Sequence, residues 1–208
     1  MGYDVENGRM NMYGLLSRML LIEADETLIK TILSDETMKE FFPLFVQWQE
    51  SLALSHETLV QDHLNVDFAS TFFIYLVPYE SFYLRDDGMI NSGGENPVIS
   101  FYTSYGFEID LPKARALSPD HIGIELEFMA KLVSEEKKAK ERGDASYAHA
   151  ILLVEKQFLE DHLLAWAPQL LLQVARHAQT PFYREAAQVA LEMILGDYEY
   201  CLSRIHQG

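Results

Sequence analysis

The chain has 208 residues, of which 49% are hydrophobic, and its 32 acidic against 16 basic residues give a formal net charge of −16 at pH 7. Such a charge repels nucleic acid and anionic lipid, whereas it favours cationic partners such as a basic peptide, and it also serves simple solubility. The lone cysteine excludes an internal disulfide, and the longest apolar run, FFIYLV at 72–77, is too short to span a bilayer. Because the opening residues also lack the features of an export signal, we expect a cytoplasmic protein without stable membrane insertion.

The first third of the chain is predicted to be helical. Residues 9–21 carry an apolar stripe at helical spacing, made of Met12, Leu15, Leu16, Met19 and Leu20. A second helical pattern opens at Ser34 or Asp35, which are both suitable N-caps, and Pro43 should kink or restart it. A third pattern over residues 55–73 continues through Leu59, His63, Val66 and Ser70.

The middle of the chain lacks a long helical period. Between Pro78 and about residue 117 it contains the turn-forming stretches RDDG and NSGGENP, together with many tyrosines and phenylalanines. We expect a loop-rich connector over about 78–117, with one short helix near residues 98–105 and with aromatic side chains that pin the loops down.

A strongly helical pattern returns at residue 118. Ser118 is a suitable N-cap, Pro119 suits the first helical position, and Asp120 complements the positive end of the helix dipole. The helix should end near residue 142, where a glycine can adopt the left-handed conformation of a helix stop. Its predicted buried positions are Ile122, Leu126, Met129 and Val133.

Three further helices are expected after this one. Asp144 or Ser146 opens the first of them, Pro168 restarts the chain as the next, and Thr180 with Pro181 begins a final helix that runs to about Ile205. Nothing in the sequence predicts a strand pair or an internal repeat. The predicted architecture is therefore all-α: a single-domain helical bundle over residues 1–208 with a loop-rich waist.

The sequence offers little conventional catalytic machinery. His56 and His63 lie seven residues apart without a third ligand at helical spacing, so we expect no metal site. There is no phosphate-binding glycine loop and no GxSxG, and Cys201 lies in an apolar setting that does not activate a thiol. We therefore expect a binding protein with no catalytic residue.

Asp120 beside His121 leaves several interpretations open. The simplest is a capped helix start that contributes ~0.3 to 1 kcal/mol of local stability. Alternatively, free N–H groups, a carboxylate and an imidazole form the polar rim of an apolar groove. Two other functional hypotheses remain: a nucleotide-binding or hydrolysing enzyme that uses these residues as acid and base, and a general assembly adaptor.

Several stretches resemble one known family. SPDHIGIELEFMAKL at 118–132, FLEDHLLAWAP at 158–168 and PYESFYLRDDGMI at 78–90 resemble the TorD/DmsD family of redox-enzyme maturation chaperones, as do the earlier segments YGLLSRMLL and DFASTFF. Family members share a proline-acid-histidine signature at a helix start, followed by an F-L-x-x-H-L-x-x-W helix. Thr71 and Leu117 depart from this pattern, since the family usually has leucine and an acid at these positions.

The resemblance implies an all-helical cytoplasmic chaperone of a molybdenum-containing oxidoreductase of the dimethyl sulfoxide reductase type. Such chaperones bind the twin-arginine leader of the cofactor-free catalytic subunit and delay its export until the molybdopterin cofactor is inserted. Guanine nucleotide binding has been suggested for some members; no other cofactor is expected. The sequence is compatible with a monomer or a homodimer.

The resemblance also implies which residues bind the leader. Pro119, Asp120 and His121 match the family signature directly, whereas Phe72 and Tyr79 match family aromatics less closely. In this hypothesis Asp120 accepts hydrogen bonds from a leader arginine, His121 fixes its position, and the two aromatic rings bury the apolar stretch of the leader.

Overall fold

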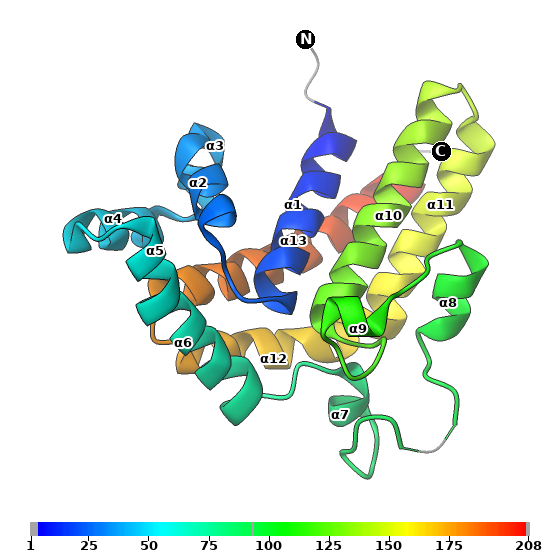
Figure 1. The fold of residues 1–208 in the computed structure, drawn as a ribbon. Coiled ribbons are helices and arrows are strands. Elements are labelled where there is room, and N and C mark those ends of the chain that lie inside the picture. The colour runs from blue at the N-terminus through cyan, green and yellow to red at the C-terminus, as the bar shows by residue number, and fades with distance from the viewer. Residues whose placement is uncertain (1–3, 93, 207–208) are drawn as a thin grey trace.

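The computed structural model describes residues 4–92 and 94–206, and it confirms the all-α prediction (Figure 1). Over these residues no strand forms, and the only sheet-like pairing is an isolated antiparallel bridge between Tyr79 and His121. No described helix is both long and apolar enough to cross a membrane. In chain order the helices, with η marking π-helical turns, are α1 (Val5–Leu21), α2 (Glu26–Ser34), α3 (Glu36–Phe41), α4 (Pro43–Leu52), α5 (His56–Thr58), η1 (Leu59–Leu64), α6 (Asn65–Ala69), η2 (Ser70–Tyr75), α7 (Glu80–Leu84), α8 (Ile99–Ser104), α9 (Leu111–Ala114), α10 (Ile122–Glu141), α11 (Ala145–Phe158), η3 (Leu159–Leu163), α12 (Leu164–His177) and α13 (Pro181–Ile205).

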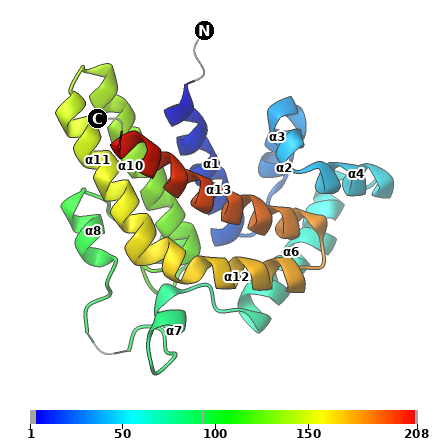
Figure 2. The same ribbon diagram turned by 180° about the vertical axis from the view of Figure 1, so that it is seen from behind.

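Four long helices form the centre of the molecule. α1 packs on α10 and α13, and α11 packs on the same two helices from the other side. Figures 1 and 2 show α10 and α11 on one side of α1 and the segment from α2 to α6 on the other. α12 packs along α13, and α7 docks onto α12. The connector from α7 to α9 is thereby attached to the base of the bundle.

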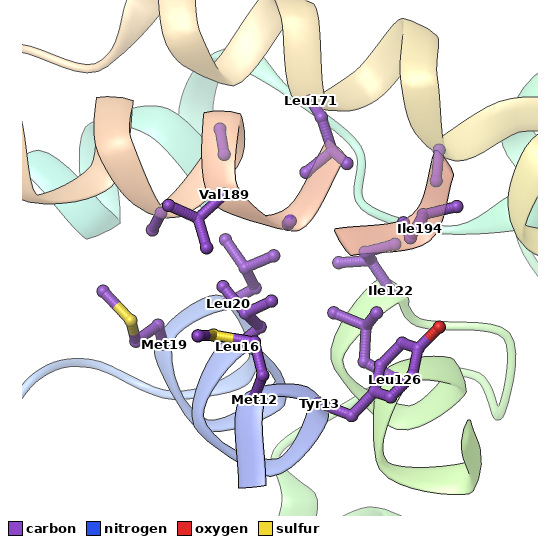
Figure 3. Close-up of a cluster of buried hydrophobic side chains, with 14 of the residues drawn as sticks. Met12, Tyr13, Leu16, Met19, Leu20, Ile122, Leu126, Leu171, Val189 and Ile194 are labelled. Atoms are coloured by element: carbon purple, nitrogen blue, oxygen red, sulfur yellow. The ribbon is translucent and has the colours of Figure 1, made fainter. Parts of the chain in front are cut away.

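The apolar stripe predicted on α1 forms part of the core. Figure 3 shows Met12, Leu16 and Leu20 of α1 facing Val189 and Ile194 of α13 and Ile122 and Leu126 of α10, with Leu171 of α12 beside them. Each of these side chains is at least nine-tenths buried. Removing apolar surface of this extent from water provides the main driving force for the fold.

A glycine lets α1 and α10 approach closely. A Cβ atom placed on Gly123 would lie 2.6 Å from the Cβ of Leu21 and 3.1 Å from the carbonyl oxygen of Ser17. No side chain fits such a gap unless a backbone moves. The start of α10 is therefore fixed against the end of α1.

A buried arginine connects four helices. Nε of Arg9 donates to Asp197 of α13 at 2.5 Å, Nη1 donates to Glu136 of α10 at 2.7 Å, and Nη2 donates to Glu155 of α11. All four side chains are almost completely buried. Burial raises the pKa of Glu155 to about 8, although the Arg9 guanidinium opposes this shift. One guanidinium thus joins α1 to three other helices.

Several helix boundaries confirm the sequence predictions. Asp35 caps α3, Pro43 restarts the chain as α4, and Asp144 caps α11. The glycine at position 143 has a φ of 74°, in the left-handed region, as expected for a residue that ends α10. α13 begins at Pro181 and ends at Ile205. These positions depend on local backbone chemistry, which the sequence specifies directly.

Other predictions in the helical regions were wrong. Pro168 does not restart a helix but lies inside α12, in the second turn after η3. The side chains on both sides of it, Ala167 and Leu170 among them, are buried, and this packing outweighs the local cost of a proline within a helix. The stripe predicted through Leu59 and Val66 is also wrong, because Val66 is 56% exposed. The turns η1 and η2 rotate the buried face away from the 3.6-residue period.

The connector contains more helix than expected. The predicted helix near 98–105 is confirmed as α8, but α7 and α9 were missed. Both are shorter than two turns and carry too few residues to show an apolar period. In each of them a backbone N–H group of the first turn donates to a carboxylate, that of Asp120 for α7 and that of Asp110 for α9.

Replacing Arg9 tests the central ion cluster. We expect Arg9→Met to lower the free energy of unfolding by about 3 to 5 kcal/mol, because it leaves buried carboxylates without their cation. Urea denaturation at pH 7 measures this loss. Lys30→Met, which removes the exposed ion pair with Glu26, should cost less than about 1 kcal/mol. Equal losses in both variants would contradict a central role for Arg9.

Candidate functional site

Four of the five predicted binding residues lie together. The bridge between Tyr79 and His121 aligns residues 78–80 with residues 120–122: Glu80 N donates to the Asp120 carbonyl and Ile122 N to the Pro78 carbonyl, each at 3.0 Å. The rings of Tyr79 and His121 meet edge to face at 5.0 Å between centroids. Two segments some 40 residues apart in sequence therefore form one junction, which also includes Pro119.

Asp120 caps a helix other than its own. Its Oδ2 atom accepts a hydrogen bond at 2.7 Å from the backbone N–H of Ser81, in the first turn of α7. Tyr79, the N-cap residue of α7, makes no side-chain cap. The carboxylate is fully buried, and its Oδ1 atom has no hydrogen-bond partner among the described residues. Asp120 therefore satisfies an otherwise free N–H group at the start of α7.

His121, and not Ser118 as predicted, is the N-cap of α10. Its Nδ1 atom accepts from Gly123 N at 3.1 Å, and the helix starts at Ile122. Pairing with residues 78–80 holds His121 in an extended conformation, so the first helical turn forms later than the local pattern predicts. Burial lowers the pKa of His121 to about 3, which keeps the imidazole neutral and able to accept at Nδ1.

Pro119 lies where the end of the connector meets the junction. The Tyr102 hydroxyl donates to its carbonyl at 3.2 Å. Next to it, Leu117 N donates to the hydroxyl of Tyr79 at 3.0 Å, and the Asn91 side chain donates to the Leu117 carbonyl at 2.7 Å. These bonds fix residues 117–119 between the connector and α10.

Phe72 lies apart from these residues. It belongs to η2 and is buried against Phe68 and against Tyr183 of α13, with ring centroids 4.9 Å and 6.0 Å away. The structure therefore places it in the packing between η2 and α13. Its neighbours Phe73, Ile74 and Tyr75 are each more than 60% exposed.

A buried polar network lies behind the junction. Nδ1 of His162 in η3 lies 3.0 Å from both carboxylate oxygens of Glu80, and the Trp166 indole donates to Glu125 at 3.2 Å. Because an ionised carboxylate only accepts, Nδ1 of His162 carries the hydrogen when Glu80 is charged. The three strongest sequence motifs thus meet in one place. Glu80, Glu125 and His162 lie within these motifs, but no local pattern in the sequence predicts a role for them.

Glu125 holds a proton in this network. Burial raises its pKa well above the usual range, and the nearby charge of Glu80 raises it further. Its Oε1 atom has no donor among the described groups, as expected for an oxygen that carries a hydrogen itself. The proximity of Glu80 thus favours the protonated form of Glu125.

The connector next to the junction exposes both apolar and acidic side chains. The exposed apolar side chains are Leu84, Met89 and Leu117, and the exposed acids are Asp86, Asp87 and Glu95. We call these six residues the loop surface. Residues 84–87 line a shallow hollow of about 380 Å³, and the bond from Asn91 to Leu117 holds the two parts of the surface together.

The described residues contain one group with metal-ligand geometry, formed by Glu155, Asp197 and Cys201. The guanidinium of Arg9 donates to both of these carboxylates and lies 3.9 Å from the sulfur atom. Burial raises the pKa of the Cys201 thiol, which disfavours the thiolate that a metal requires. The cluster is therefore a structural ion pair of the core.

Comparisons with known proteins point to one family. Residues 33–171 match the family described as nitrate reductase delta subunit. The chain is also similar to proteins named chaperone protein TorD. It is 22% identical over 124 residues to that of Vibrio vulnificus (60% of this chain, 55% of the relative), 26% over 131 residues to that of Vibrio cholerae (63% and 56%), and 27% over 138 residues to that of Actinobacillus pleuropneumoniae (64% and 59%). The chain thus spans little more than half the length of these relatives, and no solved structure matches it.

Substitution of Asp120 tests its capping role. We expect Asp120→Ala to cost about 1 to 2 kcal/mol, because the first turn of α7 loses its acceptor. Asp120→Asn, which keeps an acceptor oxygen, should cost less. Hydrogen exchange at the Ser81 amide should accelerate in the alanine variant, whereas Asp110→Ala, at the exposed cap of α9, should leave that amide unchanged. An unchanged Ser81 amide in Asp120→Ala would rule out the cap.

The buried carboxyl groups predict a pH dependence of stability. The folded-state pKa values of Glu125 and Glu155 are raised, so the folded protein holds protons that the unfolded chain releases above about pH 4.5. The free energy of unfolding should therefore fall as pH rises from about 5 to 8, with each group contributing at most about 1.4 kcal/mol per pH unit. Urea titrations should show a flatter profile for Glu125→Gln and an unchanged one for the exposed Glu57→Gln.

Proposed function

The chain belongs to the nitrate reductase delta subunit family of TorD/DmsD-like proteins, and we propose that it is a cytoplasmic chaperone in the maturation of a molybdenum-containing oxidoreductase. The name chaperone protein TorD of its relatives supports this proposal. The client would be the cofactor-free catalytic subunit of an enzyme of the dimethyl sulfoxide reductase type. Binding would delay its export until the molybdopterin cofactor is inserted.

The ligand proposed for the site is the twin-arginine leader of this client. Such a leader joins two arginines to an apolar stretch, so its receptor needs carboxylates beside exposed apolar side chains. The loop surface has this composition, because the exposed acids Asp86 and Glu95 lie on the same connector as the exposed Met89. The observation that carries the proposal is that this surface is attached to the junction where the three motifs meet, because Leu117 accepts from Asn91 and donates to Tyr79.

The burial of the predicted binding residues defines their part in this proposal. Pro119 is partly exposed and contacts the leader together with Leu117, whereas Asp120, His121 and Tyr79 hold the loop surface in position from below. Phe72 anchors η2 and contributes indirectly, through its exposed neighbours. An opening of the connector would expose the free Oδ1 atom of Asp120 to a leader arginine.

The alternative of a nucleotide hydrolase gains no support from these residues. Asp120 and His121 each use a side-chain atom to cap a backbone N–H group. A histidine whose pKa is lowered to about 3 is a poor general base near neutral pH, because it has little affinity for the proton. We therefore favour binding over catalysis.

Leader affinity tests the proposed function. A synthetic twin-arginine leader peptide should bind the full chain, and titration calorimetry should show binding weakened about 2- to 30-fold in the double variant Asp86→Asn, Glu95→Gln. That range corresponds to two exposed ion pairs of 0.2 to 1 kcal/mol each. Added salt should weaken wild-type binding as well.

A control variant with the same net charge distinguishes the effect of the loop surface on leader binding from the effect of the protein's overall charge. Asp62→Asn with Glu57→Gln removes two exposed acids from the η1 region and should leave leader affinity unchanged. Equal losses in both double variants would show that only net charge matters and would move the site elsewhere. Absence of leader binding to the wild type would reject the proposed function.

A further inference from the structure

A second surface lies between α1, α3 and α13. These helices enclose a groove of about 510 Å³, within the usual range of ligand-binding pockets. Its apolar lining includes Val5 and Met12 of α1, Met38 and Phe41 of α3, and Val189 and Met193 of α13. Figures 1 and 2 place α3 and the start of α1 at the opposite end of the molecule from α7, which adjoins the loop surface.

The apolar side chains of the groove are arranged in helical stripes. Met38 and Phe41 are three residues apart on α3, Val189 and Met193 are four apart on α13, and Val5 and Met12 are seven apart on α1. Positions at these spacings share one face of a helix. Three helices therefore turn an apolar face toward the same trough, which is the packing environment of a further helix.

The wall formed by α3 is not covered by the rest of the chain. None of its residues is buried, although it carries Met38 and Phe41, and the Phe41 side chain is 43% exposed. Met193 on the floor is only partly buried. Methionine side chains are flexible and polarizable, so they adapt to partner side chains of different shapes.

Charge defines the occupant of the groove. Asp35 and Glu192 line it and are exposed to solvent. The one cationic residue in its lining, Arg9, is buried and donates to three carboxylates, so it offers no charge to a ligand. An occupant with lysine or arginine beside its apolar face complements both this rim and the net charge of −16.

We propose that the groove between α1, α3 and α13 binds an amphipathic helix of a partner polypeptide, whose apolar stripe is flanked by basic residues. The helix lays this stripe along Met38, Phe41 and Met193, above the buried Met12, and places its cations beside Asp35 and Glu192. The inference goes beyond the proposed function, because it requires neither the leader nor the loop surface.

Methyl NMR of the full chain, labelled with ¹³C at the methionine methyl groups, tests the proposal. The probe is an 18-residue peptide of leucine and lysine with one apolar stripe at helical spacing. We expect it to shift the signals of Met12, Met38 and Met193 but not those of Met89 on the loop surface or Met129 in the core. A scrambled peptide of the same composition, and a peptide with glutamate in place of lysine, should bind at least about tenfold more weakly.

A matched pair of variants ties binding to the groove. Phe41→Ser truncates a wall residue that is 43% exposed, and Leu195→Ser truncates a residue of α13 that is 47% exposed but does not line the groove. We expect the first to weaken peptide binding about tenfold, as for an interface anchor, and the second to leave it unchanged. Both should retain the circular dichroism and the Tm of the wild type.

Four results would overturn the inference. The first three are equal binding of the scrambled peptide, signal shifts confined to Met89, and full peptide affinity in Phe41→Ser. The fourth is a shift of the Met38 and Met193 signals that depends on protein concentration in the absence of peptide, which would assign the groove to a second copy of the chain. Titration of the same labelled protein with a twin-arginine leader reports separately at Met89. Failure of the groove is therefore distinguishable from failure of the proposed function.

Discussion

The buried guanidinium of Arg9 is the interaction on which the arrangement of the long helices depends. It lies on α1 and donates to carboxylates on α10, α11 and α13, all shielded from water. A buried charge strongly destabilises the fold when its oppositely charged partner is missing. Any arrangement in which one of these helices shifts away from Arg9 is therefore higher in free energy. The apolar contacts around it supply most of the stabilisation but are less directional. Together with the close approach at Gly123, the cluster specifies which helix faces meet.

Buried polar side chains also fix the junction of the connector with α10. Two adjacent residues cap two different helices, since Asp120 accepts from α7 and His121 accepts from its own helix, α10. The acid and the neighbouring imidazole therefore serve the backbone N–H groups at the starts of α7 and α10, which would otherwise lack an acceptor. The exposed residues above the junction are held by these buried ones. A family signature can accordingly matter for ligand binding without touching the ligand.

The two surfaces proposed for partners differ in construction. The loop surface is carried by a connector with short helices, which suits adaptation to an extended leader. The groove between α1, α3 and α13 is lined by helices and suits a regular, helical partner. Both combine exposed apolar side chains with carboxylates, and both proposals therefore assign a basic polypeptide to a chain with a net charge of −16. Their separation leaves room for one client to engage both.

The sequence by itself determined the helical class, the stripe on α1, the short helix α8, the starts of α3 and α11, the C-terminal end of α10 and both ends of α13. It could do so because helical periods, caps, prolines and glycines act within a few residues. It also pointed to the segments around Tyr79, Asp120 and His162 through their resemblance to a family. Only the tertiary structure decided that these segments meet, that Asp120 is buried, and that helix α10 begins at Ile122. These features depend on contacts between residues some 40 to 190 positions apart. No local pattern encodes such contacts, since each of them exists only once the helices have packed.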